Sequence, residues 1–502
     1  MRTSFTHLLA ATLTLATATL AYAQPPAPAP GHAESTAVPP ASPPAPPPAH
    51  AEPPAVPPDS PAGKVLARVL DMFSGNYSAL SGEQLSDSFK DAVPLVKLRQ
   101  LIAQIRTTEG ALTLDSIEPG ATDTALVALV TGQTKHTPFK IRLNVDDAGK
   151  IAGLLVQPGA DPRVPPLASW DDLKARLTAA AEKATFSILA EREAPAIDPN
   201  TQAPTTIRTW DSMVALNADE PLAIGSAFKL WVLAALADTI AAGDAAWTDP
   251  LAIRDEFKSL PSGVMQNYPE GKTFTLREYA EKMIAISDNT ATDHLIHRLG
   301  RDRCEKAMRR VLLDHGDANQ PFLTTRDLFV LKLSGDDELA KRYMQAAPDT
   351  RRALLPDLAK ETPKLALAAL WKKPRWIDRL EWFASGNDLA RTLINLDELA
   401  RDGRFPTGDP RPAQPQVRDI LSLNPGVPID KKAFPYIAYK GGSEPGVLSL
   451  NWLLERADGR RFALSLTLDD TTNPIDEPLA IALATRAIEF LATWDRADAP
   501  SK

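Results

Sequence analysis

The sequence predicts an α+β protein whose larger domain, residues 165–498, is one antiparallel sheet covered by helices. Strand-like runs stand at both ends of that region, at 184–191 and 447–468, with a long helical stretch between them. Asp458-Gly459 predicts a tight hairpin turn in the second of these runs. Strands from both ends can therefore complete one sheet, with helices on its faces.

The first 62 residues are expected to lie outside any core. Residues 1–23 hold Arg2, an apolar run and the ending Ala21-Tyr22-Ala23, the pattern of a signal peptide cleaved after Ala23. Residues 24–62 are almost entirely Pro, Ala, Ser and Glu, which favours an extended linker. The linker is either a spacer through a cell envelope or a passive leader. We expect a periplasmic or secreted protein without a transmembrane anchor.

Residues 63–160 predict a separate small α+β domain. Apolar periodicity favours helices near 65–73 and 94–105, and strand-like runs follow them. The pattern resembles the nuclear-transport-factor-2-like or cystatin-like modules. Since it holds no constellation that suggests chemistry, we expect it to bind or position something, including an envelope component.

Composition narrows the range of partners. The net charge is -8 and no long Lys/Arg run is present, which argues against nucleic acid and anionic membrane surfaces. The hydrophobic share of 44% is enough for a large core. Cys304 is the only cysteine, so no intramolecular disulfide can form. A small-molecule substrate is the remaining expectation.

Ser226 and Lys229 form a Ser-x-x-Lys pair at the start of a predicted helix. Residues three apart are neighbours on a helix surface, so the lysine can take the proton of the serine nucleophile as its general base. Apolar residues surround Lys229 in 228–236, and burial there would favour its neutral form. About one such pair is expected by chance in a chain of this length, so the pair alone is weak evidence.

A second motif, Ser287-Asp288-Asn289, strengthens the interpretation. Chance produces this triplet in roughly one such chain in ten to twenty. Ser287 can relay a proton to a leaving group, and Asn289 can hold a substrate amide and the lysine. Asp288 would orient the loop.

The third motif is Lys440-Gly441-Gly442-Ser443, which follows a β-rich run. Glycines on a strand edge let a substrate lie against the backbone. The N–H groups of Ser443 and Ser226 would together form an oxyanion hole. Lys440 would supply positive potential for an anionic substrate.

The order of these motifs resembles that of class A β-lactamases and penicillin-binding proteins. The resemblance covers most of residues 170–495, and 287–300 with Thr324-Thr325 looks especially like class A enzymes. With the small domain in front, the arrangement is also similar to the two-domain β-lactamase-like protein of clavulanic acid gene clusters. The resemblance implies a β-lactamase-like fold and acylation at Ser226.

Two departures from the family pattern limit this implication. Class A enzymes use a loop glutamate to activate the water that hydrolyses the acyl-enzyme, and residues 316–325 contain no glutamate. Asp314 and Asp317 are the nearest carboxylates, and a helix-ending role suits them better. Gly441 stands where the family carries a hydroxyl that binds the β-lactam carboxylate, so Ser443 is the expected substitute. Helices between Thr325 and Lys440 could cover the site.

A zinc site is disfavoured, and we expect no cofactor. Asp293, His294, His297 and Cys304 are ligand types for zinc, but no His-Glu-x-x-His is present and the residues fit a polar helix face.

Three functions remain open. The first is a serine hydrolase acting on β-lactams, weakly, or on small esters. The second is a D,D-peptidase or penicillin-binding protein that forms a slow acyl-enzyme. The third is a non-catalytic binding module.

Overall fold

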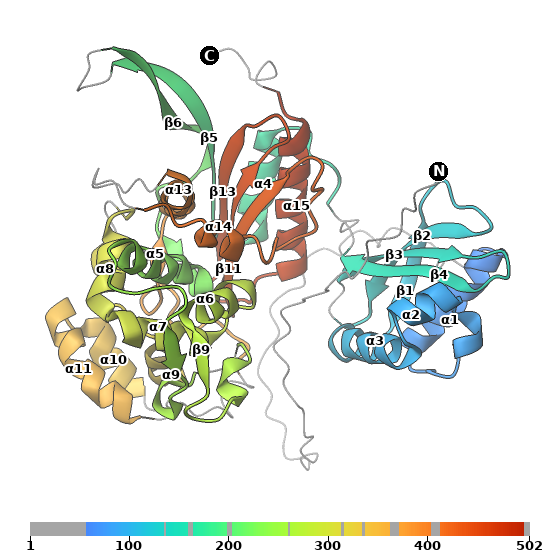
Figure 1. Cartoon of the computed structure of the whole chain (residues 1–502), viewed down its shortest axis with the longest axis horizontal. Coiled ribbons are helices and arrows are strands. Elements are labelled where there is room, and N and C mark those ends of the chain that lie inside the picture. Colours follow the sequence, from blue (N-terminus) through green and yellow to red (C-terminus); the bar gives the residue numbers. More distant parts are fainter. Residues whose placement is uncertain are drawn as a thin grey trace, which may run out of the picture. The chain divides into compact units, whose positions relative to one another are not determined.

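The computed structural model describes residues 57–134, 137–158, 164–197, 203–259, 262–312, 316–333, 337–361, 371–402 and 412–495. The signal peptide, most of the linker and Asp314 lie outside these residues. The described residues form two compact units, one up to residue 159 and the other from residue 160 onward. Figure 1 gives the order of the elements along the chain.

The smaller unit consists of helices followed by a four-stranded sheet. Its α-helices are α1 (Pro61–Phe73), α2 (Asp87–Ala92) and α3 (Leu95–Glu109). Its strands are β1 (Leu112–Ile117), β2 (Ala125–Gly132), β3 (Pro138–Val145) and β4 (Ile151–Pro158), antiparallel and in that order. Buried and half-buried residues alternate along β2, as expected for a sheet with one covered face. One apolar core joins the helices to the sheet, and the type of module stays a prediction.

The larger unit is built on a five-stranded antiparallel sheet with the strand order β11-β12-β13-β5-β6. The strands are β5 (Lys183–Ile197), β6 (Pro204–Leu216), β11 (Tyr436–Glu444), β12 (Val447–Glu455) and β13 (Arg461–Asp469). Strands from the two ends of this region meet where β13 pairs with β5. The predicted β-lactamase-like arrangement of sheet and helices is confirmed.

Helices cover both faces of this sheet. On one face, α4 (Trp170–Ala180) and α15 (Glu477–Thr493) pack with Phe186, Trp452 and Leu464 into one core. On the other face, α13 (Gly386–Asp402) and the helical part of the unit pack into a second core with Leu453 and Ala463. In Figure 1, α4 and α15 lie beside the sheet, away from α5 and α8.

The helical part surrounds α5 (Lys229–Ala241), nearly all of whose side chains are buried. Around it stand α6 (Leu276–Ala285), α7 (Asn289–Leu299), α8 (Arg301–Arg309), α9 (Thr325–Leu333) and α14 (Gln416–Leu421). Two short strand pairs join β7 (Leu222–Ala223) to β10 (Phe383–Ala384) and β8 (Pro250–Ala252) to β9 (Thr273–Thr275). None of the helices in the described segments is long and apolar enough to cross a bilayer.

Different parts of the long stretch between Thr325 and Lys440 pack against different elements. Helices α10 (Asp337–Gln345) and α11 (Pro348–Lys360) pack against α9 (Figure 1). Trp382, by contrast, lies directly against the start of α5.

Candidate active site

Ser226 lies in a short 3-10 helix, Gly225–Phe228, that leads directly into α5. Gly225 before it has a φ of +47°, a conformation that favours glycine. The turn is held from behind by Trp382, whose carbonyl accepts the N–H of Ile224 at 3.0 Å and whose ring stacks on Phe228 at 3.7 Å. Ser226 is therefore fixed on both sides while its side chain stays partly exposed.

Lys229 is completely buried and lies beside the nucleophile, with Nζ 3.1 Å from Ser226 Oγ. Its Nζ also lies 2.7 Å from both Ser287 O and Asn289 Oδ1, and 3.0 Å from Ser287 Oγ. Burial lowers the pKa of Lys229 to about 7, although the charges of Asp288 and Asp293 oppose the shift. The Ser287 carbonyl and the Asn289 amide oxygen can only accept hydrogen bonds, so they can accept from the two N–H groups of a neutral Lys229 amine. The lone pair is then left for the Ser226 hydroxyl.

Ser287 joins the two lysines of the site. Its Oγ lies 3.0 Å from Lys229 Nζ and 3.1 Å from Lys440 Nζ. Its backbone has a φ of +56°, which is unusual for a residue with a side chain. Ser262 Oγ donates to the Ser287 carbonyl at 2.7 Å, which helps to hold this conformation.

Asp288 fixes the loop around Ser287, as the sequence predicted. One carboxylate oxygen caps α7 by accepting from Ala291 N at 2.8 Å. The other accepts from Val264 N at 2.6 Å and Met265 N at 2.9 Å. A Cβ at Gly263 would lie 2.2 Å from this carboxyl group, so only glycine allows the approach.

Strand β11 brings the third motif against the nucleophile. A Cβ at Gly442 would lie 2.5 Å from Ser226 N and 2.1 Å from Ile224 O, distances that no side chain tolerates. On the other side, Ser443 N is 3.1 Å from the place where a Cβ at Gly225 would stand. The backbone N–H groups of Ser226 and Ser443 therefore belong to two segments in direct contact.

Lys440 is also buried, with 3% of its surface exposed, and its Nζ lies near Ser287 Oγ and the carbonyl of Gly441. Burial, and then the charge of Lys229, lower the pKa of Lys440 well below its ordinary value. The state in which Lys229 and Lys440 are both protonated therefore costs electrostatic free energy. Protonation of one opposes protonation of the other.

Gly441 has a structural explanation that the sequence did not provide. A Cβ at this position would lie 2.2 Å from the hydroxyl of Tyr439, whose ring packs against Trp452 at 4.9 Å. The phenol fills the space that a threonine or serine side chain would occupy. The side chain of Ser443 is exposed, so its hydroxyl is open to solvent.

The segment 316–325 contains one carboxylate, Asp317, which is exposed and accepts from Arg309 at 3.1 Å and Gln320 at 3.0 Å. Asn319 instead braces the chain beside the nucleophile, exchanging two hydrogen bonds with the backbone of Phe383. Thr324 and Thr325 begin α9, and Thr325 Oγ1 donates to Asp293 at 2.8 Å. This segment serves to cap a helix and brace the fold.

The residues considered as zinc ligands are engaged elsewhere or buried. His294 accepts from Arg254 N at 2.8 Å and lies 2.7 Å from Thr290 O, whereas His297 stacks on Phe257. Asp293 accepts from the backbone of Thr325 and Arg326, and Cys304 is buried. Within the described ranges no three His, Cys, Asp or Glu side chains form a group that could hold a metal ion.

Sequence reasoning missed one buried charge cluster beside the site. Lys332 of α9 has Nζ 2.8 Å from Glu381 Oε1 and 2.5 Å from Glu444 Oε1. Glu444 directly follows the third motif, which was the only available signal. Nothing in the sequence connects it to a lysine 112 positions away.

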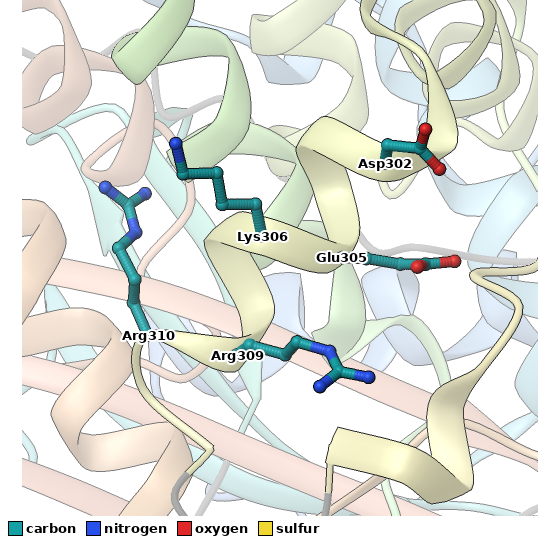
Figure 2. Close-up of a pocket in the computed structure, with 5 residues that line it drawn as sticks. All are labelled: Asp302, Glu305, Lys306, Arg309 and Arg310. Atoms are coloured by element: carbon teal, nitrogen blue, oxygen red, sulfur yellow. The ribbon is translucent and has the colours of Figure 1, made fainter.

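Two surface hollows contain no residue of the three motifs. One, of about 440 Å³, runs along α8, where Asp302, Glu305, Lys306, Arg309 and Arg310 extend from the helix (Figure 2). Two of its charged side chains are engaged in ion pairs, Arg310 with Asp238 and Glu305 with Arg352. The other, of about 340 Å³, lies beside β7 and Asp469. Ser226 lines neither hollow.

Two family models match the chain. Residues 201–360 match the β-lactamase enzyme family, and residues 57–151 match the N-terminal part of the ORF 12 gene product family. No curated protein sequence matches the chain.

Solved structures to which the chain is similar include PBP-A, at 15% identity, 66% coverage of this chain, 100% of that chain and a TM-score of 0.40. A β-lactamase from Sphaerobacter thermophilus gives 19%, 65%, 99% and 0.40. An ancestral (GNCA) class A β-lactamase gives 17%, 64%, 97% and 0.39. By the family match of residues 201–360, this part of the larger unit is similar to the β-lactamase enzyme family.

Proposed function

We propose that the chain is an exported serine hydrolase that is acylated at Ser226 by strained amides such as β-lactams or by small esters. The observation that carries the proposal is the contact of a fully buried Lys229 with Ser226, at 3.1 Å from Nζ to Oγ. A lysine with a pKa of about 7 is neutral in a large fraction of molecules at neutral pH and can act as a general base.

Acylation then proceeds in steps that each use a residue in contact with the next. Lys229 takes the proton of Ser226 as Oγ bonds to the substrate carbonyl carbon. The N–H groups of Ser226 and Ser443 stabilise the oxyanion, aided by the start of α5. Ser287 gives its proton to the leaving group and regains one from Lys229 or Lys440, both about 3 Å away.

Lys440 and Asn289 contribute to substrate binding. An anionic group beside Lys440 would favour its protonated form, against the burial that lowers its pKa. Binding of an anionic substrate would therefore be coupled to uptake of a proton. Asn289 already holds Lys229 at 2.7 Å and supplies an amide that can also face a substrate amide.

The absence of a glutamate from residues 316–325 favours a second candidate, a D,D-peptidase or penicillin-binding protein. Their single carboxylate, Asp317, is exposed and engaged with Arg309. Acylation without a base for water gives a long-lived acyl-enzyme. The two candidates share the nucleophile and differ in how fast the acyl group leaves.

The test compares the wild-type chain with Ser226→Ala on nitrocefin and p-nitrophenyl acetate. Ser74→Ala, at an exposed serine of the smaller unit, is the matched control. We expect the wild type and the control to show the same burst of product, and Ser226→Ala to show none. A burst followed by slow turnover supports the second candidate, and continuous turnover supports the first. Equal hydrolysis by Ser226→Ala would refute the proposal.

A further inference from the structure

Lys332, Glu381 and Glu444 form a buried cluster that no step of the proposed reaction uses. The side chains of Lys332 and Glu381 are fully buried and that of Glu444 is 8% exposed. The three residues come from α9, from the segment before β10 and from the end of β11. A buried lysine that contacts two carboxylates in this way ties three distant segments together.

Glu444 connects the cluster to the proposed oxyanion hole. It directly follows Ser443, whose N–H is one of the two donors. Side chains alternate along a strand, so Lys440, Gly442 and Glu444 share one face of β11. That face meets the nucleophile, because Gly442 lies against Ser226 N. Anchoring Glu444 therefore fixes the strand on the far side of the Ser443 donor.

Glu381 connects the cluster to the nucleophile turn. Its second carboxylate oxygen accepts from Trp382 N at 3.1 Å. Trp382 in turn accepts the N–H of Ile224 and stacks on Phe228, which stand on either side of Ser226. One lysine thus links the support of Ser226 to the support of Ser443.

The charges of the cluster balance when one carboxyl group is protonated. Burial, and then the neighbouring Glu381, raise the pKa of Glu444 well above its ordinary value, against the pull of Lys332. Burial opposes the charge of Lys332, but Glu381 and Glu444 outweigh it and raise its pKa. Glu444 is therefore the carboxyl group that favours the protonated form, while Lys332 stays charged.

We propose that Lys332, Glu381 and Glu444 are positioning residues that hold the Ser443 N–H donor at its working distance from Ser226. The inference rests on the proposed function, since it assumes that Ser226 is acylated. An oxyanion-hole donor that moves by about 1 Å loses much of its effect on the transition state and little of its effect on substrate binding.

The experiment measures the acylation rate constant and the substrate dissociation constant for three variants of Glu444. Glu444→Ala should slow acylation about 10- to 100-fold with little change in substrate dissociation. Glu444→Asp keeps the carboxyl group but shortens the reach, so about a tenfold loss is expected. Glu444→Gln imitates a protonated Glu444, and should stay within about threefold of wild type.

A second buried ion cluster provides a matched control. Asp397 of α13 has a side chain only 2% exposed and accepts from Arg418 and Arg461. In the strand register, Arg461 of β13 lies opposite Glu455 of β12, which lies opposite Tyr436 of β11. Arg461 therefore lies at the Tyr436 end of the sheet, whereas Ser443 lies near the other end of β11. Asp397→Ala should lower the melting temperature, as Glu444→Ala should, and leave the acylation rate constant of the folded protein unchanged.

The outcomes separate the inference from the proposed function. If the wild type is not acylated, both fail. If the wild type is acylated and both Glu444→Ala and Glu444→Asp acylate at the wild-type rate, only the positioning role fails. An equal loss of acylation in Asp397→Ala would also overturn it, because the effect would then be general destabilisation. If Glu444→Ala does not fold, the ratio of Glu444→Asp to Glu444→Gln decides.

Discussion

Lys229 and Lys332 are two lysines of one unit whose side chains are equally and fully buried, yet burial has opposite outcomes for them. Lys229 contacts two hydroxyls, a carbonyl and an amide oxygen, and its pKa falls to about 7. Lys332 contacts the carboxylates of Glu381 and Glu444, and its pKa rises.

The partners therefore decide what a buried lysine can do. Desolvation penalises the charged form in both places, and only opposite charges in direct contact outweigh it. Lys229 has carboxylates nearby, in Asp288 and Asp293, but both already accept hydrogen bonds from backbone N–H groups. Lys229 can therefore be neutral at neutral pH and act as a base, whereas Lys332 stays protonated there and supports the fold.

The largest effect that separates the two lysines is on acylation by Lys229→Met. Removing the base should slow acylation about 1,000-fold, or about 4 kcal/mol in activation free energy. The rate of the burst with nitrocefin measures it. A Lys229→Met protein that acylates within about tenfold of wild type would show that another group takes the serine proton.

The next effect is on stability, and here Lys332 should dominate. Lys332→Met leaves Glu381 and Glu444 buried without their cation, which should cost about 3 kcal/mol of unfolding free energy. Lys229→Met removes a group whose burial is itself costly, so its loss should be clearly smaller. Chemical denaturation of both variants checks the order. The reverse order would contradict the assigned charge states.

The smallest effect is on pH dependence. Acylation should rise about tenfold per pH unit below pH 7 and level off above it, because the neutral form of Lys229 is the base. A profile that falls as pH rises through 7 would contradict this role.

The contributions of Lys229 and Lys332 to the unfolding free energy should change with pH in opposite directions. The folded pKa of Lys229 lies below its ordinary value of 10.5, so the unfolded chain binds more protons between pH 7 and 10.5. The unfolding free energy of wild type relative to Lys229→Met should therefore rise with pH across that window. For Lys332, whose folded pKa is raised, the contribution is present below 10.5 and is lost above it.

The grouping of residues around Lys229 could be predicted from the sequence because these residues belong to short motifs. Ser226 and Lys229 lie one helical turn apart, and the residues of Ser287-Asp288-Asn289 and Lys440-Gly441-Gly442-Ser443 are contiguous. The structure brings all three motifs together. The assembly of one antiparallel sheet followed equally well from the strand-like runs at both ends of the region.

The Lys332 cluster could not be predicted because its members are 49 and 112 positions apart. No local pattern indicates which buried charges meet across such distances. The same limit applies to Gly441. The sequence showed that a hydroxyl is absent there, and only the structure shows that the phenol of Tyr439 occupies its place.

The most direct test of the central claim is peptide-level mass spectrometry of the chain after brief exposure to a chromogenic cephalosporin. A covalent adduct on the peptide that contains Ser226, absent in Ser226→Ala and strongly reduced in Lys229→Met, is the result we predict. An adduct on another residue, or no adduct together with no turnover, would contradict the assignment of Ser226 as the nucleophile.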